Sequence, residues 1–150
     1  MNKSKAWVGI DPGKTGAIAL IAEREVIVHD FDGVSEMSEL LVTWKFEYDI
    51  VRVLLENVSA MKGWGIKGCF SFGKNVGNWE GIVATLKFPY DYVTPKKWQS
   101  TIFKGTKVEN TKKESIETAR RLFPLVTIPK SKDGRSDALL IAEYNKRIYG

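Results

Sequence analysis

The 150-residue chain contains one cysteine, Cys69, and one histidine, His29. A single cysteine excludes a disulfide bond within the chain and any zinc site built from several cysteines. A single histidine excludes zinc chemistry that needs several imidazoles and argues against a Ser-His-Asp triad, so we interpret His29 as an ordinary residue near a strand end. Carboxylates, lysines and a metal ion remain as the candidates for chemistry.

Long apolar segments are also missing from the sequence. No run is long and apolar enough to cross a bilayer, and the first residues do not form a signal-peptide pattern, so we expect no membrane partner. The length fits one domain, residues 1–150, and 43% apolar residues suffice for a core. An actin-like ATPase needs two such domains around a cleft, so the length excludes that class and we expect no nucleotide cofactor.

Positive charge is unevenly distributed along the chain. The formal net charge is +5, and many of the lysines and arginines lie between positions 96 and 135. This asymmetry indicates a polyanionic partner, with nucleic acid as the first candidate. A solvated helix surface explains the same charges equally well.

The pattern of apolar and turn residues predicts alternating strands and helices. The predicted strands comprise residues 6–10, 16–22, 25–30, 51–56 and 90–94, the first three forming an antiparallel meander. The predicted helices comprise residues 35–46, 79–86, 96–103, 111–123 and 136–147. Residues 59–78 combine five glycines with aromatic side chains, and we expect a flexible loop there.

Four carboxylates lie at the ends of these apolar elements. Asp11 ends the first strand and Glu56 ends the fourth, so both emerge near one edge if the strands are neighbours. Asp133 and Asp137 are four residues apart and would share one face of a helix. Converging carboxylates repel one another unless cations are present, so the four are either scattered surface charges or a divalent-metal site. Two metal ions about 4 Å apart could activate water and stabilise the departing oxygen of a phosphodiester.

Several motifs in this order resemble those of the RuvC-type Holliday junction resolvases. They are Gly-Ile-Asp11-Pro-Gly, Leu-Leu-Glu56-Asn and Asp133-Gly-Arg-Ser-Asp137-Ala-Leu-Leu-Ile-Ala. Two further segments are similar to the phage branch of that family, namely Phe70-Ser-Phe-Gly-Lys-Asn-Val-Gly-Asn-Trp79 and Tyr92-Val-Thr-Pro-Lys-Lys-Trp98. The resemblance covers nearly the whole chain, from about Trp7 to Tyr144.

The resemblance implies an RNase H-like α/β fold, a five-stranded mixed sheet flanked by helices with its first three strands antiparallel. It implies a metal-dependent endodeoxyribonuclease of DNA recombination and repair, a homodimer that nicks two opposed strands of a four-way junction. By motif, the metal-binding and catalytic tetrad is Asp11, Glu56, Asp133 and Asp137, holding two Mg²⁺ or Mn²⁺ ions. Asp11 would be shared between the ions, and a neighbour of Asp133 could take the third position. A phage source, and hence the bacterial cytoplasm, is also implied.

The same resemblance gives roles to basic and aromatic residues. Lys113 matches a family lysine near the scissile phosphate, so we expect it to offset charge in the transition state. Aromatic rings on a glycine-rich loop could stack on unpaired bases, with core packing as the alternative. The residues predicted to contact DNA are Lys96, Lys97, Lys104, Lys107, Lys112, Trp64, Phe70 and Phe72.

Two other functions stay open at this point. One is a broader branched-DNA nuclease of the same fold, which would also cut flaps, three-way junctions and replication forks. The other is a non-catalytic junction-binding module, which would need a broken tetrad, whereas the sequence contains all four acids.

Overall fold

The computed structural model describes residues 2–131 and 133–150, and a five-stranded sheet of order β3-β2-β1-β4-β5 forms its centre. β1 (Ser4–Asp11), β2 (Ala17–Ala22) and β3 (Val26–Asp30) pair antiparallel. β4 (Tyr48–Glu56) runs parallel to β1, and β5 (Tyr90–Val93) runs parallel to β4. The predicted mixed sheet with an antiparallel first half is therefore confirmed.

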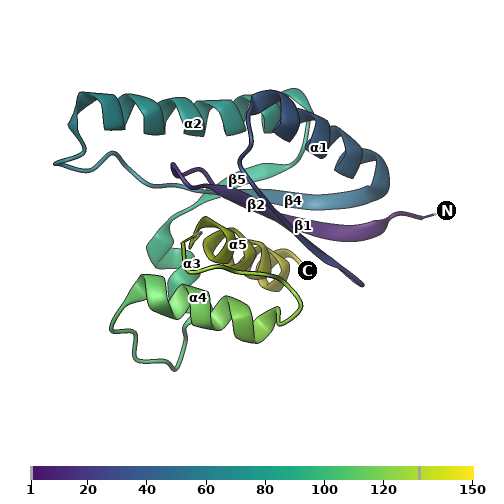
Figure 1. Cartoon of the computed structure of the whole chain (residues 1–150). Coiled ribbons are helices and arrows are strands. Elements are labelled where there is room, and N and C mark those ends of the chain that lie inside the picture. The colour runs from purple at the N-terminus through teal and green to yellow at the C-terminus, as the bar shows by residue number, and fades with distance from the viewer. Residues whose placement is uncertain (1, 132) are drawn as a thin grey trace.

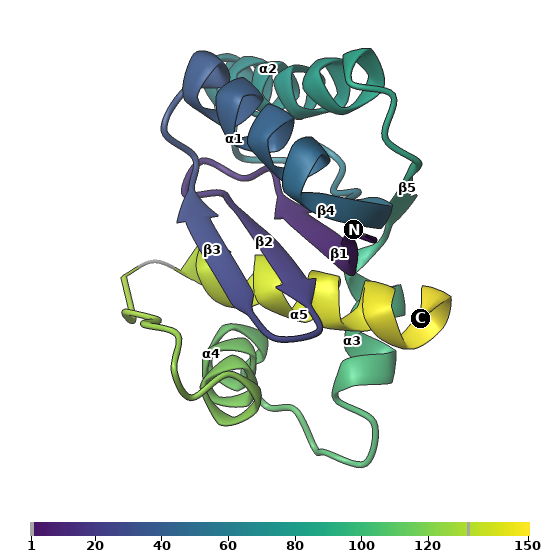
Figure 2. The same cartoon turned by 90° about the vertical axis from the view of Figure 1, so that its right-hand side faces the viewer.

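Helices cover both faces of this sheet (Figures 1 and 2). α1 (Val34–Glu47) and α2 (Gly65–Thr85) lie on one face. α3 (Pro95–Ile102), α4 (Thr111–Leu122) and α5 (Asp133–Tyr149) lie on the other, with α5 packed directly on the strands and α4 packed on α5. No helix in the described part of the chain is long and apolar enough to cross a membrane.

Alternate residues of the central strands supply two separate cores. On β4, Val53 and Leu55 belong to the core under α1 and α2, whereas Leu54 belongs to the core under α5. This alternation follows from the two-residue period of a strand, and burial on both faces explains the nearly continuous apolar runs. Glu56 lies two residues after Leu54, so its side chain is directed to the face that carries α5.

α5 lies closer to Gly9 of β1 than a larger residue at that position would permit. A Cβ atom on Gly9 would lie 2.4 Å from the carbonyl oxygen of Ala138 and 2.4 Å from the nitrogen of Ala142. A Cβ atom on Gly134, at the start of α5, would lie 2.0 Å from the carbonyl oxygen of Thr15. Gly9 lets α5 lie against β1, and Gly134 lets the start of α5 lie against the β1–β2 turn.

The prediction of a flexible loop over residues 59–78 is wrong. α2 begins at Gly65 and continues for 21 residues, so it includes most of that segment. Each interior glycine weakens a helix by about 1 kcal/mol relative to alanine, but burial of Trp79, Ile82 and Val83 offsets that cost in the C-terminal half. The N-terminal half extends beyond the ends of the strands (Figure 1), and Ile66 is 91% exposed there.

The other elements agree with the predicted ones to within three residues at either end. The most useful difference is at α5, which begins at Asp133 rather than at Ser136. Asp133 and Asp137 therefore lie one turn apart on the same helix, as the four-residue spacing predicts.

Candidate active site

The four predicted carboxylates come from three elements that meet at one edge of the sheet. Asp11 and Glu56 end two parallel, adjacent strands, in which Ile10 pairs with Leu55. Asp133 and Asp137 lie on the first turns of α5, which packs on both strands. The charge of Asp11 acts on Glu56 and on Asp137, and the charge of Asp133 acts on Asp11. The structure therefore brings all four side chains into electrostatic contact.

Burial and mutual repulsion raise the pKa values of these acids. The pKa of Asp11 is raised from 3.8 to about 6, mainly by burial and further by the charge of Asp133, while the backbone N–H of Gly13 donates to Oδ1 at 2.9 Å and opposes the rise. The pKa of Glu56 is raised from 4.5 to about 7, mainly by burial and then by the charge of Asp11. A hydrogen bond from Trp98 limits that increase.

Asp137 is perturbed in the same direction. Burial is the largest cause of its raised pKa, followed by the charges of Asp11 and Glu56, with a smaller effect from Asp133. The Ser115 hydroxyl of α4 lies close enough to lower this pKa. That hydroxyl is buried and forms no well-aligned hydrogen bond within the described residues, so it opposes the rise only in part.

The donor set fits a hard divalent cation. Four carboxylates supply only oxygen ligands, which Mg²⁺ and Mn²⁺ prefer, and a cation would remove the repulsion that raises their pKa values. Across residues 2–131 and 133–150, no three His, Cys, Asp or Glu side chains form a ready-made cage for one ion. The fit therefore rests on the chemistry of the donors and on their electrostatic coupling.

Asp133 differs from the other three acids because it already has a cationic partner. Lys112 Nζ lies 3.3 Å from Asp133 Oδ2, and the Thr15 hydroxyl donates to Oδ1 at 3.5 Å. The side chain of Asp133 is also 32% exposed. Asp133 thus lies at the outer edge of the group, and the metal-binding role of all four acids stays a prediction.

Comparison with solved structures shows which fold holds this site. RuvC of Thermus thermophilus in complex with its Holliday junction substrate superposes with a TM-score of 0.68 at 16% identity, over 96% of each chain. A second Thermus thermophilus RuvC structure gives a TM-score of 0.61 at 17% identity, over 95% of this chain and 96% of that one. This chain has the RuvC fold. The predicted RNase H-like fold class is thereby confirmed.

A viral resolvase shares the same architecture. The fowlpox virus resolvase, in complex with its substrate Holliday junction DNA, gives a TM-score of 0.51 at 16% identity, over 93% of this chain and 98% of that chain. No protein-family model and no curated protein matches the sequence. The comparisons therefore establish the fold of this chain.

Within this RuvC fold, Trp98 lies at the carboxylates and is not among the residues predicted from the sequence. It is part of the Tyr-Val-Thr-Pro-Lys-Lys-Trp segment, but no sequence signal assigns it a role. In the structure its indole N–H donates to Glu56 Oε2 at 2.6 Å. The two residues are 42 positions apart, so only the tertiary fold reveals the contact.

Arg135 was also missed, although it lies between the two acids of α5. Its Nε and Nη2 donate to the two oxygens of Asp30 at 2.7 and 3.0 Å, and its Nη1 donates to the carbonyl oxygen of Thr127 at 3.0 Å. A bidentate guanidinium–carboxylate pair fixes orientation as well as distance. Arg135 therefore anchors the start of α5 to the end of β3.

The predicted basic residues lie on α3, on α4 and on the loop between these helices. Lys112 contacts Asp133, whereas Lys113 is exposed and lies 3.9 Å from Glu117 on the outer face of α4. Four further lysines are exposed, in the first turn of α3 and in the loop that follows it: Lys96, Lys97, Lys104 and Lys107. Lys112 thus forms an ion pair with one of the four acids, and the role of Lys113 near the scissile phosphate stays a prediction.

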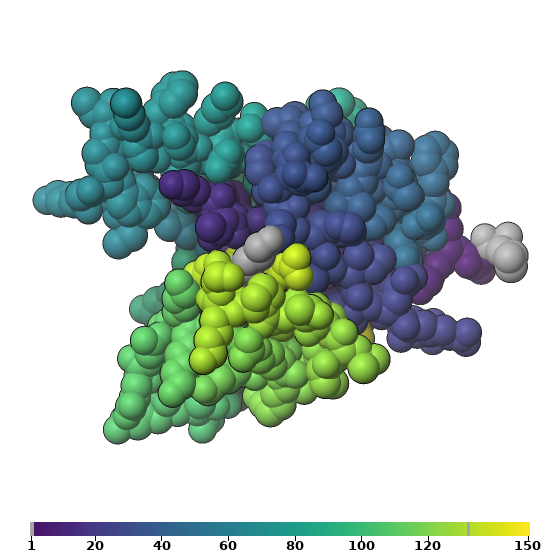
Figure 3. All heavy atoms as spheres, viewed as in Figure 1, coloured from purple at the N-terminus to yellow at the C-terminus, as the bar shows by residue number. Residues whose placement is uncertain are grey.

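The predicted aromatic residues lie on the projecting half of α2 and just before it. Phe70 is 73% exposed, so core packing does not explain it. Trp64 and Phe72 pack edge to face against each other, with ring centroids 5.1 Å apart. Figure 3 shows the surface hollowed between this projecting part (teal) and the layer of α4 and α5 (green), next to the β1–β2 turn (purple).

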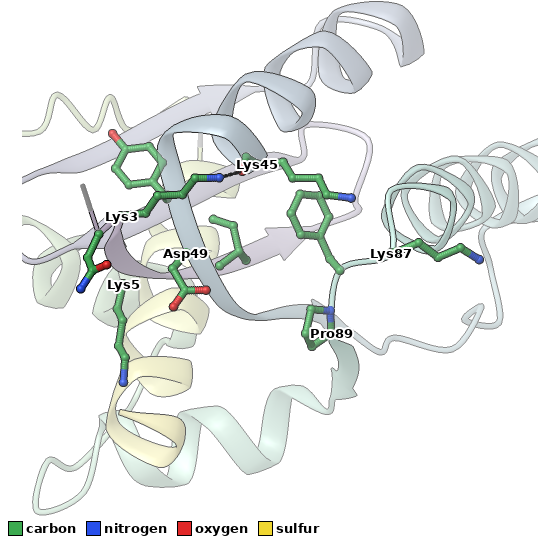
Figure 4. A pocket seen from close by; sticks show the side chains of 10 residues that line it. Lys3, Lys5, Lys45, Asp49, Lys87 and Pro89 are labelled. Atoms are coloured by element: carbon green, nitrogen blue, oxygen red, sulfur yellow. Dashed lines mark hydrogen bonds between the residues drawn. The ribbon is translucent and has the colours of Figure 1, made fainter.

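A separate hollow of about 610 Å³ lies at the opposite end of the sheet (Figure 4). Two of its lysines hold helix ends, because Lys3 Nζ donates to the carbonyl oxygen of Lys45 at 2.9 Å and Lys45 Nζ donates to that of Leu86. Such cations stabilise the negative C-terminal end of a helix. Asp49 is its single carboxylate, so this hollow is not the candidate metal site.

Proposed function

We propose that this protein is a structure-selective endodeoxyribonuclease that resolves four-way DNA junctions. The observation that carries the proposal is the electrostatic coupling of Asp11, Glu56, Asp133 and Asp137 at one edge of a RuvC fold. A formal net charge of +5 supports a polyanionic substrate. All four acids are present, so nothing in the chain favours a non-catalytic junction-binding module.

The four carboxylates would hold two Mg²⁺ or Mn²⁺ ions. When bound, these ions would lower the pKa of a coordinated water and stabilise negative charge on the departing oxygen of the phosphodiester. Asp11 interacts electrostatically with each of the other three acids, which suits a ligand shared between two ions. Glu56 and the Asp133/Asp137 pair would complete one site each.

Protons have to leave the site before it can bind a cation. Asp11 and Glu56 have pKa values raised to about 6 and about 7, and the pKa of Asp137 is raised as well. Metal binding therefore releases protons, and the apparent metal affinity increases with pH in the neutral range. Trp98 and Gly13 keep one oxygen each of Glu56 and Asp11 hydrogen-bonded while the proton leaves.

The lysines supply affinity for the DNA backbone rather than sequence recognition. Lys112 is near the carboxylates and would approach a phosphate bound there, while Lys113 would reach the phosphate only by leaving Glu117. Lys96 and Lys97 lie in the first turn of α3, where helix amide groups add to their attraction for phosphate. Contacts of this kind give steep salt dependence.

The projecting half of α2 offers aromatic surface to unpaired bases. Phe70 and Trp64 are exposed. They belong to α2 and the residue before it, and the first half of α2 extends beyond the ends of the strands (Figure 1). Base stacking on such rings contributes about 1–3 kcal/mol per base and does not read sequence. Phe70 lies on α2, and Trp64 precedes the helix and packs on Phe72, so both rings would meet a junction in a fixed position.

We further propose a homodimer of the phage branch that works in the bacterial cytoplasm. A four-way junction presents two equivalent scissile strands, and a twofold dimer presents two equivalent sites. Each subunit would nick one strand, which leaves a symmetric pair of ligatable products.

A panel of labelled DNA substrates tests the proposed function. Purified protein is incubated with Mg²⁺ or Mn²⁺ and an immobile four-way junction, beside a duplex, a flap and a three-way junction. Paired symmetric nicks confined to the four-way junction are expected. Equal cutting of flaps and three-way junctions would instead establish a broader branched-DNA nuclease, and the absence of cutting on all four substrates would contradict a nuclease altogether.

A further inference from the structure

Trp98 connects α3 to the carboxylate edge through one buried hydrogen bond. Its Nε1–H donates to Glu56 Oε2 at 2.6 Å, Trp98 is fully buried, and Glu56 is 7% exposed. A hydrogen bond to an ionised carboxylate is about twice as strong as one between neutral groups. We propose that Trp98 is a positioning residue that orients Glu56 for cation binding, an inference that rests on the proposed metal-dependent function.

The chain segment around Trp98 fixes its position relative to Glu56. Val93 of β5 pairs with Glu56, and the backbone N–H of Asn57 donates to the Val93 carbonyl oxygen at 2.8 Å. The Thr94 side chain then accepts a hydrogen bond from the backbone N–H of Lys97 at 3.3 Å and caps α3. A proline follows at the first helical position, where its fixed φ favours the helix.

The first turn of α3 consequently directs the indole back toward the strand end. Trp98 also packs edge-on against Phe103, with ring centroids 5.8 Å apart, which restricts rotation of the indole. The donor therefore has little freedom to leave Glu56. This arrangement depends on the short path from Val93 through the capped turn to Trp98.

The hydrogen bond holds one oxygen of the Glu56 carboxylate in place. Oε2 accepts from the indole, which fixes the orientation of the carboxylate group and would leave Oε1 to a cation. Without the indole N–H, a buried glutamate has several side-chain orientations that do not reach the shared site. Removing the partner that orients a metal ligand typically lowers metal affinity or activity by about 10–100-fold.

Trp7 provides a matched control for loss of an indole N–H. It is also buried, on β1, and its Nε1 has no hydrogen-bond partner within the described residues. Trp7→Phe and Trp98→Phe therefore remove the same group from two buried tryptophans, of which only Trp98 bonds a carboxylate. An effect confined to Trp98→Phe cannot come from loss of an indole alone.

The test follows the tryptophan side-chain signals in ¹⁵N–¹H NMR spectra of the full chain during titration with Mg²⁺ alone. The Trp98 signal is expected to shift on addition of Mg²⁺ and in Glu56→Gln, whereas the Trp7 signal stays in place in both. Trp98→Phe is expected to need at least about 10-fold more Mg²⁺ for half-saturation, and Trp7→Phe the wild-type concentration. The proposal would be overturned if the Trp98 signal has the same position in Glu56→Gln as in the wild type. It would also be overturned if Trp98→Phe and the wild type bind Mg²⁺ with equal affinity.

The readouts separate this inference from the proposed function. A wild-type protein that cuts no DNA, but whose Trp98 signal follows Mg²⁺ and Glu56, supports the positioning role and contradicts the nuclease. A wild-type protein that cuts junctions, with Trp98→Phe unchanged in both Mg²⁺ affinity and cutting rate, supports the nuclease and contradicts the positioning role. If Trp98→Phe does not fold, the proposal is tested by comparing the Trp98 signal in the wild type with that in Glu56→Gln. An unchanged signal would overturn the proposal.

Discussion

At the scale of single residues, the acids at the sheet edge hold protons that ordinary carboxyl groups have already lost. The pKa values of Asp11 and Glu56 are 3.8 and 4.5 for ordinary groups and rise to about 6 and about 7 in the folded protein. At a pH between the ordinary pKa and the raised pKa of each acid, the folded state binds more protons than the unfolded chain. The free energy of unfolding therefore falls as pH rises through this range when no cation is bound.

A divalent cation should reverse that loss of stability at high pH. At a Mg²⁺ concentration 100-fold above Kd, binding to the folded state alone stabilises it by about 2.7 kcal/mol. At pH 8 the acids are ionised, so Mg²⁺ should raise Tm clearly, whereas at pH 5 protons compete and the increase should be much smaller. Thermal unfolding in Mg²⁺ and in chelator at both pH values, with ionic strength matched by NaCl, measures this.

Substitutions at two acids test whether the Mg²⁺-dependent rise in Tm comes from binding at the four carboxylates. Asp137→Asn should remove most of the Mg²⁺-dependent rise in Tm at pH 8. Asp49→Asn, which changes an exposed acid at the far end of β4, should keep it. An equal rise at pH 5 and pH 8, or an undiminished rise in Asp137→Asn, would show that Mg²⁺ binds elsewhere.

At the scale of elements, the placement of α5 against β1 decides whether the acids can meet. Gly9→Ala would put a Cβ atom 2.4 Å from backbone atoms of α5, which cannot rotate away as a side chain can. Forcing extra volume into a packed core costs about 1–3 kcal/mol. Urea denaturation should show a destabilisation of at least that size, with weaker Mg²⁺ binding because α5 carries two of the acids.

Gly77 is the matched control for this substitution. It lies inside α2, and an added Cβ atom would meet nothing within 4 Å. Gly77→Ala should therefore stabilise the protein by about 0.5–1 kcal/mol through helix propensity. Wild-type stability of Gly9→Ala would refute the close approach of α5 to β1.

The sequence predicts those elements whose signals are local. Asp11 and Glu56 end apolar runs of β-branched and aliphatic residues, and the meander is joined by short turns, so both strands and the shared edge could be predicted. α5 could be predicted from its apolar periodicity and from the four-residue spacing of Asp133 and Asp137. The catalytic roles of these acids stay predictions until they are tested.

The sequence does not predict features that depend on tertiary packing. The glycines of residues 59–78 indicate a loop, but burial of Trp79, Ile82 and Val83 stabilises a helix that continues back to Gly65. The hydrogen bond from Trp98 to Glu56 joins two segments that are distant in the sequence, and no local sequence pattern predicts it. The contact of Lys112, rather than Lys113, with Asp133 depends on how α4 docks on α5.

At the scale of the whole molecule, two groups of lysines lie at opposite ends of the sheet. Lys96 and Lys97 are on α3, on the side of the carboxylates, while Lys5 and Lys87 line the hollow at the other end. A DNA substrate bound at the carboxylates should contact only the first group. The distribution of charge therefore predicts which lysines affect binding.

The salt dependence of junction binding checks this prediction. The double substitution Lys96→Ala/Lys97→Ala should lower the slope of log K against log salt by about 2, because each lost phosphate contact lowers it by about 1. Lys5→Ala/Lys87→Ala removes the same charge and should leave the slope unchanged. Binding titrations in chelator over a range of NaCl concentrations measure both variants. An equal decrease of the slope in both would mean that junction binding depends only on the net charge of the protein.

The most direct measurement of the central claim compares wild type and Asp11→Asn on a labelled four-way junction, for cleavage in Mg²⁺ and for binding in chelator. Cleavage by Asp11→Asn is expected to fall by about 10³-fold or more, since metal-assisted charge stabilisation supplies several kcal/mol. Binding should stay equal or become tighter, because one negative charge near the DNA backbone is removed. Nicking by Asp11→Asn at the wild-type rate would contradict a metal-dependent nuclease site at Asp11.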